Sequence, residues 1–382
     1  MASPARPGRR TLADKWSSME RILISRSAEG GLALPEVAFS LFFFSSDSEH
    51  NMNDKYSALL DIAEFADARG FAAIWTPERH FHRFGGLFPN PAVLSAAIAA
   101  RTKRIRIRAG SVQVPLHHPI RIAEDWAIVD NVSGGRVDIA FTSGWHPRDY
   151  VFAPELFPRR RELLFERVDM LRRLWRGEQL PFTSGFGETV AGALYPAPIQ
   201  PELPVWITTS RTLDTWKRAG AIGANILTAL YAIDRDTLAA NIVAYREARR
   251  EHGHRGPGTV SVMLHTFVGE DADQVRETVR QPLIDYILQH TELYDLNEIA
   301  VRMKLDPGQL TEKHRRMLAK LAADRYFQTS SLIGTPDSCR EMIDSLADIG
   351  VNEIACLIDF GIRHEDVLTS LTLLDQLQLQ YV

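Results

Sequence analysis

The chain has 382 residues, of which 45% are hydrophobic and 24% charged, and its formal net charge is -4. This composition is typical of a globular protein with one large α/β domain or two medium ones. The nearly balanced charge and an isoelectric point near 6.3 give no electrostatic reason to expect a nucleic acid or an anionic membrane as partner.

The remaining compositional features point to a protein of the cytoplasm. No uninterrupted apolar stretch reaches the roughly 20 residues that span a bilayer. Cys339 and Cys356 lack metal-ligand spacing and offer no disulfide framework, so we expect a reducing compartment. Residues 1–35 mix proline, glycine, serine and charge without the apolar core of a signal peptide, and we interpret them as a tail or linker.

From Val37 onward, strand-like and helix-like segments alternate. The first expected helix places Leu59, Ile62 and Ala66 on one face and ends at Gly70, a typical C-terminal cap. The eight expected strands are residues 37–44, 71–77, 104–115, 137–144, 204–210, 224–230, 259–269 and 353–360. This alternation over residues 36–382 predicts a parallel (β/α)8 TIM barrel. An open doubly wound sheet is disfavoured, because no glycine-rich phosphate loop follows the first strand.

Two of the connections between expected strands are longer than a minimal barrel requires. The first covers about residues 145–204, between the fourth and fifth expected strands, and includes a Gly/Thr/Pro-rich part at 182–204. The second covers about residues 270–330, between the seventh and eighth strands, and contains extra helices. Since insertions after strands lie on the C-terminal face of a barrel, we expect both to form lids over a site there. Loops that only decorate the surface are the alternative.

The second strand delivers the densest group of ionisable side chains. The stretch FAAIWTPERHFHRFGG contains this strand and the residues that follow it, among them Glu78, Arg79, His80 and His82. Other strand ends supply mostly hydroxyl groups, and neither clustered carboxylates nor a histidine pair with ligand spacing accompanies them, so a metal hydrolase is disfavoured. The absence of a G-x-S-x-G elbow also disfavours acyl transfer.

The segment TTSRT, residues 208–212, follows a strand and opens a helix. Its backbone N–H groups would face the barrel mouth at the positive end of a helix dipole, and Ser210, Thr212 and Arg211 add further donors. This arrangement predicts a phosphate site without a Walker lysine. A plain helix cap formed by Ser210 or Thr212 is the alternative.

Several segments together resemble the bacterial luciferase-like flavin monooxygenases, in particular the branch associated with natural-product biosynthesis. They are WTPERHF, NPAVLSAAIAART, RAGSVQVPLHHPIRIAEDWAIVDNVSGGRVDIAFTSGW and WITTSRTLDTWKRAGAIGANILT. The resemblance runs from about Val37 to Phe360. It implies a barrel that binds reduced FMN, supplied by a separate flavin reductase, and uses O2 through a flavin C4a-hydroperoxide to oxygenate a substrate.

The resemblance also implies roles for individual residues. Thr142 and Ser143 match positions beside the flavin, Ser210 matches a phosphate-binding serine, and Gly110–Ser111 falls where relatives bend the third strand, some through a non-proline cis peptide. Together with Thr209 and Arg211 these are the expected cofactor-binding residues.

The strand-two tip matches a pair of histidines in luciferase itself, but Arg79 replaces the first of them, which puts light emission from an aldehyde in doubt. We expect Glu78, Arg79 and His80 to be the catalytic residues. An arginine cannot act as a base, but it can hold a peroxy anion, a carboxylate or a carbonyl. His80 could shuttle a proton or only orient Glu78. On position alone, Trp145, His146 and Tyr195 are expected on the substrate wall.

The function expected from these observations is oxygenation of a biosynthetic intermediate, including one tethered to an acyl or peptidyl carrier protein, by a homodimeric enzyme. Two alternatives stay open. The first is an oxidoreductase that uses a deazaflavin, because relatives with this barrel do so. The second is a non-catalytic flavin-binding scaffold subunit.

Overall fold

The computed structural model describes residues 36–45, 56–83, 85–144, 146–231, 233–289, 300, 303, 306 and 310–381. The expected tail, residues 1–35, and Trp145 lie outside these described residues. The domain boundary near residue 35 therefore stays a prediction.

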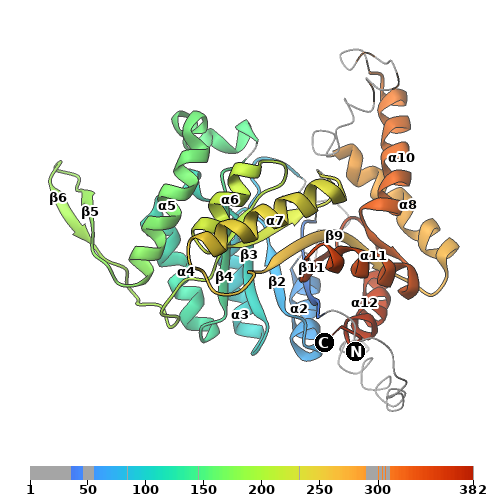
Figure 1. Ribbon diagram of the computed structural model, residues 1–382, viewed down its shortest axis with the longest axis horizontal. Helices are drawn as coiled ribbons and strands as arrows, with labels where there is room; N and C mark the ends of the chain where they lie inside the picture. The colour runs from blue at the N-terminus through green and yellow to red at the C-terminus, as the bar shows by residue number, and fades with distance from the viewer. Residues whose placement is uncertain are drawn as a thin grey trace, which may run out of the picture. The chain divides into compact units, whose positions relative to one another are not determined.

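Eight parallel strands close into a barrel (Figure 1). Their order around the barrel is β1, β2, β3, β4, β7, β8, β9, β11, and β11 pairs in turn with β1. Their bounds are β1 Ala38–Phe42, β2 Ala73–Thr76, β3 Arg106–Gln113, β4 Val137–Thr142, β7 Val205–Thr208, β8 Asn225–Ala229, β9 Val260–Val268 and β11 Glu353–Leu357. Each strand lies within one of the eight expected segments, and the predicted (β/α)8 barrel is confirmed.

Side chains alternate along the barrel strands between two apolar layers. On β1, Leu41 belongs to the layer under the helices, whereas its neighbour Phe42 belongs to the barrel interior. On β2, Ile74 likewise belongs to the layer under the helices and Trp75 to the barrel interior. Because both faces of these strands are buried, their sequences are nearly continuous apolar runs. In the interior, the rings of Trp75 and Trp206 meet edge to face at 5.1 Å.

Helices cover the outside of the barrel (Figure 1). Their bounds are α2 Ser57–Arg69, α3 Pro91–Arg101, α4 Pro119–Ser133, α5 Arg160–Trp175, α6 Leu213–Ala221, α7 Arg235–Glu251, α8 Ala272–Gln289, α10 Glu312–Thr329, α11 Pro336–Asp348 and α12 His364–Gln378. The predicted cap of α2 is confirmed, because Gly70 has φ 79° and donates its N–H to Ala66. At α3, the Asn90 side chain accepts from two N–H groups of the first turn. No described helix combines the length and apolarity of a membrane span.

The first expected insertion has two parts with different positions. Residues 146–159 follow β4 directly and form two short 3-10 helices, η4 Pro147–Phe152 and η5 Pro154–Arg159. Residues 176–204 instead follow α5, so they connect a helix to the next strand. They contain the antiparallel hairpin of β5 Leu180–Thr183 and β6 Thr189–Gly192, which projects from the barrel in Figure 1.

The second expected insertion contributes helices α8 and α10. Their apolar faces pack with the interior residues Leu357 and Phe360 rather than with the outer layer. A short strand, β10 Leu332–Gly334, follows α10 and pairs in parallel with the end of β9. This strand was not expected from the sequence.

A buried ion network crosses the barrel interior. Arg108 on β3 donates from Nε to Asp138 on β4 over 2.6 Å and from Nη1 to Glu353 on β11 over 2.8 Å. Its guanidinium lies over the rings of Trp75 and Trp206 at 4.8 and 4.4 Å from their centroids. Burial alone would lower the pKa of Arg108, but the two carboxylates outweigh it and raise the pKa. The network therefore ties strands from opposite sides of the barrel through one cation.

Candidate active site

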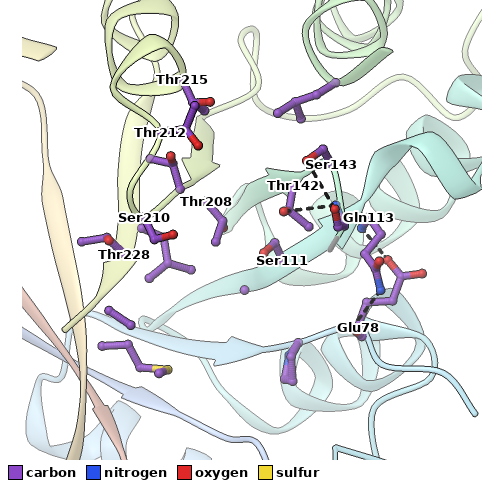
Figure 2. A pocket seen from close by; sticks show the side chains of 18 of the residues that line it. Glu78, Ser111, Gln113, Thr142, Ser143, Thr208, Ser210, Thr212, Thr215 and Thr228 are labelled. Atoms are coloured by element: carbon purple, nitrogen blue, oxygen red, sulfur yellow. Dashed lines mark hydrogen bonds between the residues drawn. The ribbon is translucent and has the colours of Figure 1, made fainter. Parts of the chain in front are cut away.

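A cavity of about 640 Å³ lies at the C-terminal ends of the barrel strands. The strand ends of β2, β3, β4, β7 and β8 line it, together with side chains from α5, α6 and α8. Figure 2 shows Thr208, Ser210 and Thr228 on one side of the pocket and Thr142 and Ser143 on the other. A cavity at this end of a parallel barrel is where enzymes of this architecture bind substrates and cofactors.

The residues that we expected to bind a cofactor all line this one cavity. They are Gly110, Ser111, Thr142, Ser143, Thr209, Ser210 and Arg211. Two further hydroxyls line it, those of Thr208 and Thr228, and within the described part of the chain neither has a hydrogen-bond partner. Buried polar atoms are rarely left unsatisfied, so these two hydroxyls fit a bound polar ligand.

Three arginines that the sequence analysis missed add positive charge to the lining of the cavity. Arg160 and Arg161 begin α5, Arg218 lies on α6, and all three line the cavity. A signal was present in the sequence, because cations at a helix N-terminus oppose the helix dipole. Arg160 and Arg161 thus lie at a helix start where the dipole disfavours cations, and both line the cavity.

The bed of the cavity is formed by Gly110 on β3. A Cβ atom at this position would lie 2.8 Å from Phe42 and 3.0 Å from Trp75, so a side chain does not fit. The peptide bond between Gly110 and Ser111 is cis, and the pairing of β3 with β4 shifts by one residue here. The backbone of β3 is therefore the surface that a flat ligand would contact.

At the strand-two tip, Arg79 lines the cavity and is 7% exposed. Its Nη1 donates to both carboxylate oxygens of Asp149, at 3.2 and 2.9 Å. Asp149 is 1% exposed, belongs to η4 and also accepts from the Gln113 amide at 3.1 Å. The segment after β4 therefore fixes the position of Arg79, which follows β2.

The neighbouring Glu78 is held by two histidines. His80 donates to Glu78 Oε1 at 2.8 Å, His117 bonds to the same oxygen, and the Gln113 N–H donates to Oε2 at 2.7 Å. Burial would raise the pKa of Glu78, but these hydrogen bonds outweigh it and lower the pKa. Burial would likewise lower the pKa of His117, but the bond to Glu78 and its charge raise it. The pair is therefore stabilised in its charged form.

The ring of His80 does not line the cavity, although it was expected at the reactive centre. It packs edge to face against Phe152 at 4.9 Å, and its Nε2 points to Glu78, which does line the cavity. Glu78, His80 and His117 also form the one group of described residues whose ligand atoms, all within 4.8 Å of one another, could hold a metal ion. Because Glu78 and His117 are far apart in the sequence, their spacing gave no such signal.

The expected substrate wall is not where the cavity lies. Neither His146 nor Tyr195 lines it, and Tyr195 is 76% exposed in the connection between β6 and β7. Trp145 lies outside the described residues. The wall is formed instead by Phe44, Tyr231, Met263 and, from the second insertion, Tyr286.

Comparisons with known proteins identify the family of this chain. A family model described as luciferase-like monooxygenase matches residues 36–353. The chain is 23% identical over 343 residues to the oxygenase component of the flavin-dependent trigonelline monooxygenase of Acinetobacter baylyi, covering 87% of this chain and 92% of that protein. It is 27% identical over 302 residues to the 4-hydroxyprotoasukamycin monooxygenase of Streptomyces nodosus subsp. asukaensis, covering 76% of each.

Solved structures share the fold. The oxygenating component of 3,6-diketocamphane monooxygenase of Pseudomonas putida, in complex with FMN, has a TM-score of 0.68 at 17% identity, covering 89% of this chain and 97% of that one. The coenzyme F420-dependent tetrahydromethanopterin reductase of Methanopyrus kandleri has a TM-score of 0.66 at 18% identity, covering 87% and 96%.

Proposed function

Because the chain belongs to the luciferase-like monooxygenase family, we propose that it is the oxygenase component of a two-component, FMN-dependent monooxygenase. The observation that supports this most directly is the single cavity that collects the hydroxyls, arginines and glycine bed described above. Reduced FMN bound there would supply the electrons that activate O2 for transfer of one oxygen atom to a substrate. The reduced cofactor would come from a separate flavin reductase, as an oxygenase component among the relatives suggests.

The donor set fits the FMN phosphate at the β7–α6 end of the cavity. Ser210 and Thr212 precede the first turn of α6, where backbone N–H groups and the helix dipole favour an anion. Arg161 and Arg218 line the same end, and the described residues form no salt bridge with either of them. Their charges would therefore be available to balance a phosphate.

The flavin ring would lie on the bed at Gly110. The hydroxyls of Ser111, Thr142 and Thr208 line the cavity around it and can bond to polar ring edges. Phe44 and Tyr286 close the other end with apolar surface, which would keep water from the reacting atoms.

Arg79 would hold the oxygen atoms at the reacting end by donating N–H bonds. We propose that Glu78 acts beside it and that His80 positions Glu78, since His80 bonds to that carboxylate and lies off the cavity. The substrate would be a biosynthetic intermediate, free or tethered to a carrier protein, for which the Streptomyces relative is the support.

The experiment that tests this proposal compares cofactors. We expect FMN to raise the melting temperature of the protein, because a ligand present at 100 times its Kd stabilises the folded state by about 2.7 kcal/mol. Coenzyme F420 at the same concentration should have no comparable effect. The reverse result would favour the alternative of a deazaflavin-dependent oxidoreductase, which relatives of this fold motivate.

A second measurement addresses the oxygen chemistry. Reduced FMN bound to the protein should be reoxidised by O2 more slowly than free reduced FMN, since the closed cavity limits water and proton access. Equal rates, together with no substrate oxidation when a flavin reductase is added, would instead indicate a flavin-binding scaffold.

A further inference from the structure

The two ends of the cavity differ in charge balance. At the β7–α6 end, Arg161 and Arg218 line the cavity, and the salt bridges among the described residues involve neither of them. Arg218 lies over the ring of Phe165, which is one turn along α5 from Arg161. Asp214 is the acidic side chain that lines this end. This end is positively charged, as a site for an anionic group requires.

At the strand-two end, by contrast, each charge has a partner. Arg79 is paired with Asp149, and both side chains are buried, with 7% and 1% exposed. Glu78 is paired with His117 through a direct hydrogen bond. The raised pKa of His117 and the lowered pKa of Glu78 favour the ionised form of this pair as well.

Pairing with Asp149 changes what Arg79 can recognise. A guanidinium carries five N–H donors, so an ion pair through Nη1 balances its charge without using up its hydrogen-bonding capacity. A carboxylate placed against this pair would lose its hydration and face a locally balanced site, which is unfavourable. An uncharged oxygen acceptor loses far less hydration and still receives a charge-assisted hydrogen bond.

The geometry points to a substrate whose oxygen-bearing group at Arg79 is uncharged, a carbonyl or hydroxyl rather than a carboxylate. Aromatic side chains at this part of the cavity, among them Phe44 and Tyr286, favour a planar molecule that carries this group. Asp149 is the positioning residue that sets the preference, because it holds Arg79 and balances its charge. The inference rests on the proposed function only because it takes the other ligand to be a flavin. The charge argument does not depend on that identity.

The test uses two matched probes, 2-naphthamide and 2-naphthoate, titrated calorimetrically into the full-length protein with and without saturating FMN. We expect the wild-type protein with FMN to bind the amide more tightly than the carboxylate, by roughly tenfold. Asp149→Asn should abolish or reverse this preference. The Gln113 amide can follow the change, since its Oε1 has no partner among the described residues and can accept from Asn.

Asp169→Asn is the matched control, because it removes one negative charge from an exposed position on α5 that does not line the cavity. It should keep the wild-type ratio. Should Asp149→Asn fail to fold, Arg79→Met serves instead, and it should weaken amide binding and leave carboxylate binding weak.

Any of three results would overturn the inference. They are tighter wild-type binding of naphthoate in the presence of FMN, binding of neither probe, and an unchanged ratio of the two affinities in Asp149→Asn. The proposed function is judged separately, by whether FMN itself binds to the same samples.

Discussion

An arginine side chain does not act as a base near neutral pH, so Arg79 is not expected to remove a proton from a substrate. Its position in the cavity and its ion pair with Asp149 make it a donor held in a fixed place. The luciferase pattern that this segment resembles has a histidine where this chain has Arg79. The substitution therefore exchanges a group that can titrate for one that only binds.

Replacing Arg79 by methionine should separate binding from chemistry. We expect FMN affinity to change less than about threefold while substrate turnover falls by roughly a hundredfold or more, as for loss of a donor to the reacting group. FMN titration and single-turnover measurements check both. If FMN affinity fell instead, Arg79 would belong to the cofactor site.

His265 illustrates a buried group whose state depends on the fold. It is fully buried, Nδ1 bonds to the Tyr326 hydroxyl at 2.9 Å, and burial lowers the pKa of His265 from 6.5 to about 3. The folded protein therefore keeps it neutral at pH values where the unfolded chain protonates it. Its contribution to stability is complete above pH 6.5 and is lost progressively as the pH falls toward 3.

This linkage gives a measurable pH dependence. Between pH 7 and pH 5, the wild-type protein should lose about 2 kcal/mol of unfolding free energy through His265 alone. His265→Phe should lack this component, so its loss of stability over the same interval should be smaller by that amount. Urea denaturation at both pH values measures it. Identical losses in the two proteins would show that His265 titrates normally.

At the scale of elements, the start of α5 is a helix turn whose sequence opposes the helix dipole and lines the cavity. Arg160 and Arg161 occupy the turn where the dipole disfavours cations, and both face the cavity. Arg159, one residue earlier, is exposed, pairs with Glu162 and does not line the cavity. The same short run therefore contains residues that face the site and a residue that does not.

Arg159 and Arg161 therefore allow a matched test of the proposed phosphate site. Arg161→Met should weaken FMN binding by roughly tenfold and make it less sensitive to salt, because one screened charge–charge interaction is removed. Arg159→Met should leave FMN affinity unchanged. Fluorescence titration of FMN at low and high salt distinguishes the two variants. Equal effects would mean that Arg161 acts only through the overall charge of the helix.

At the scale of the whole molecule, the barrel is held from inside by the network of Arg108, Asp138 and Glu353. Glu353 also accepts from the hydroxyls of Ser40 on β1 and Ser261 on β9, at 2.8 and 2.9 Å. One cation thus connects residues of five strands below the cavity. Such a network is stable only when complete, because each buried charge depends on the others.

Removing the cation should therefore destabilise the whole barrel. We expect Arg108→Leu to lower the free energy of unfolding by about 3–5 kcal/mol, since buried Glu353 loses its cation and Asp138 keeps only Arg106. Arg121→Leu, at an exposed position with 69% of the side chain accessible, should have little effect. Urea denaturation compares them. A similar small change in both variants would show that the interior carboxylates are protonated or hydrated.

The sequence by itself determined the barrel, its eight strands and the strand-end residues that line much of the cavity. These features are local or periodic: apolar runs bounded by turns give the strands, and residues at their ends must meet at the mouth of a parallel barrel. Ser210, Thr142 and Gly110 were placed at the barrel mouth in this way, and they line the cavity. The resemblance to the luciferase-like family is confirmed, and the cofactor role that it implies for these residues stays a prediction.

Only the tertiary structure decided which charges are paired. Asp149 joins Arg79 and His117 joins Glu78 across wide separations in the chain, and no periodicity records such a contact. The position of Tyr195 also depends on tertiary structure, because it lies in the connection between α5 and β7 and does not line the cavity. The contacts that pair charged groups determine the chemistry of the site, and they depend on three-dimensional packing. Strands and helices depend instead on residues that are close in the sequence.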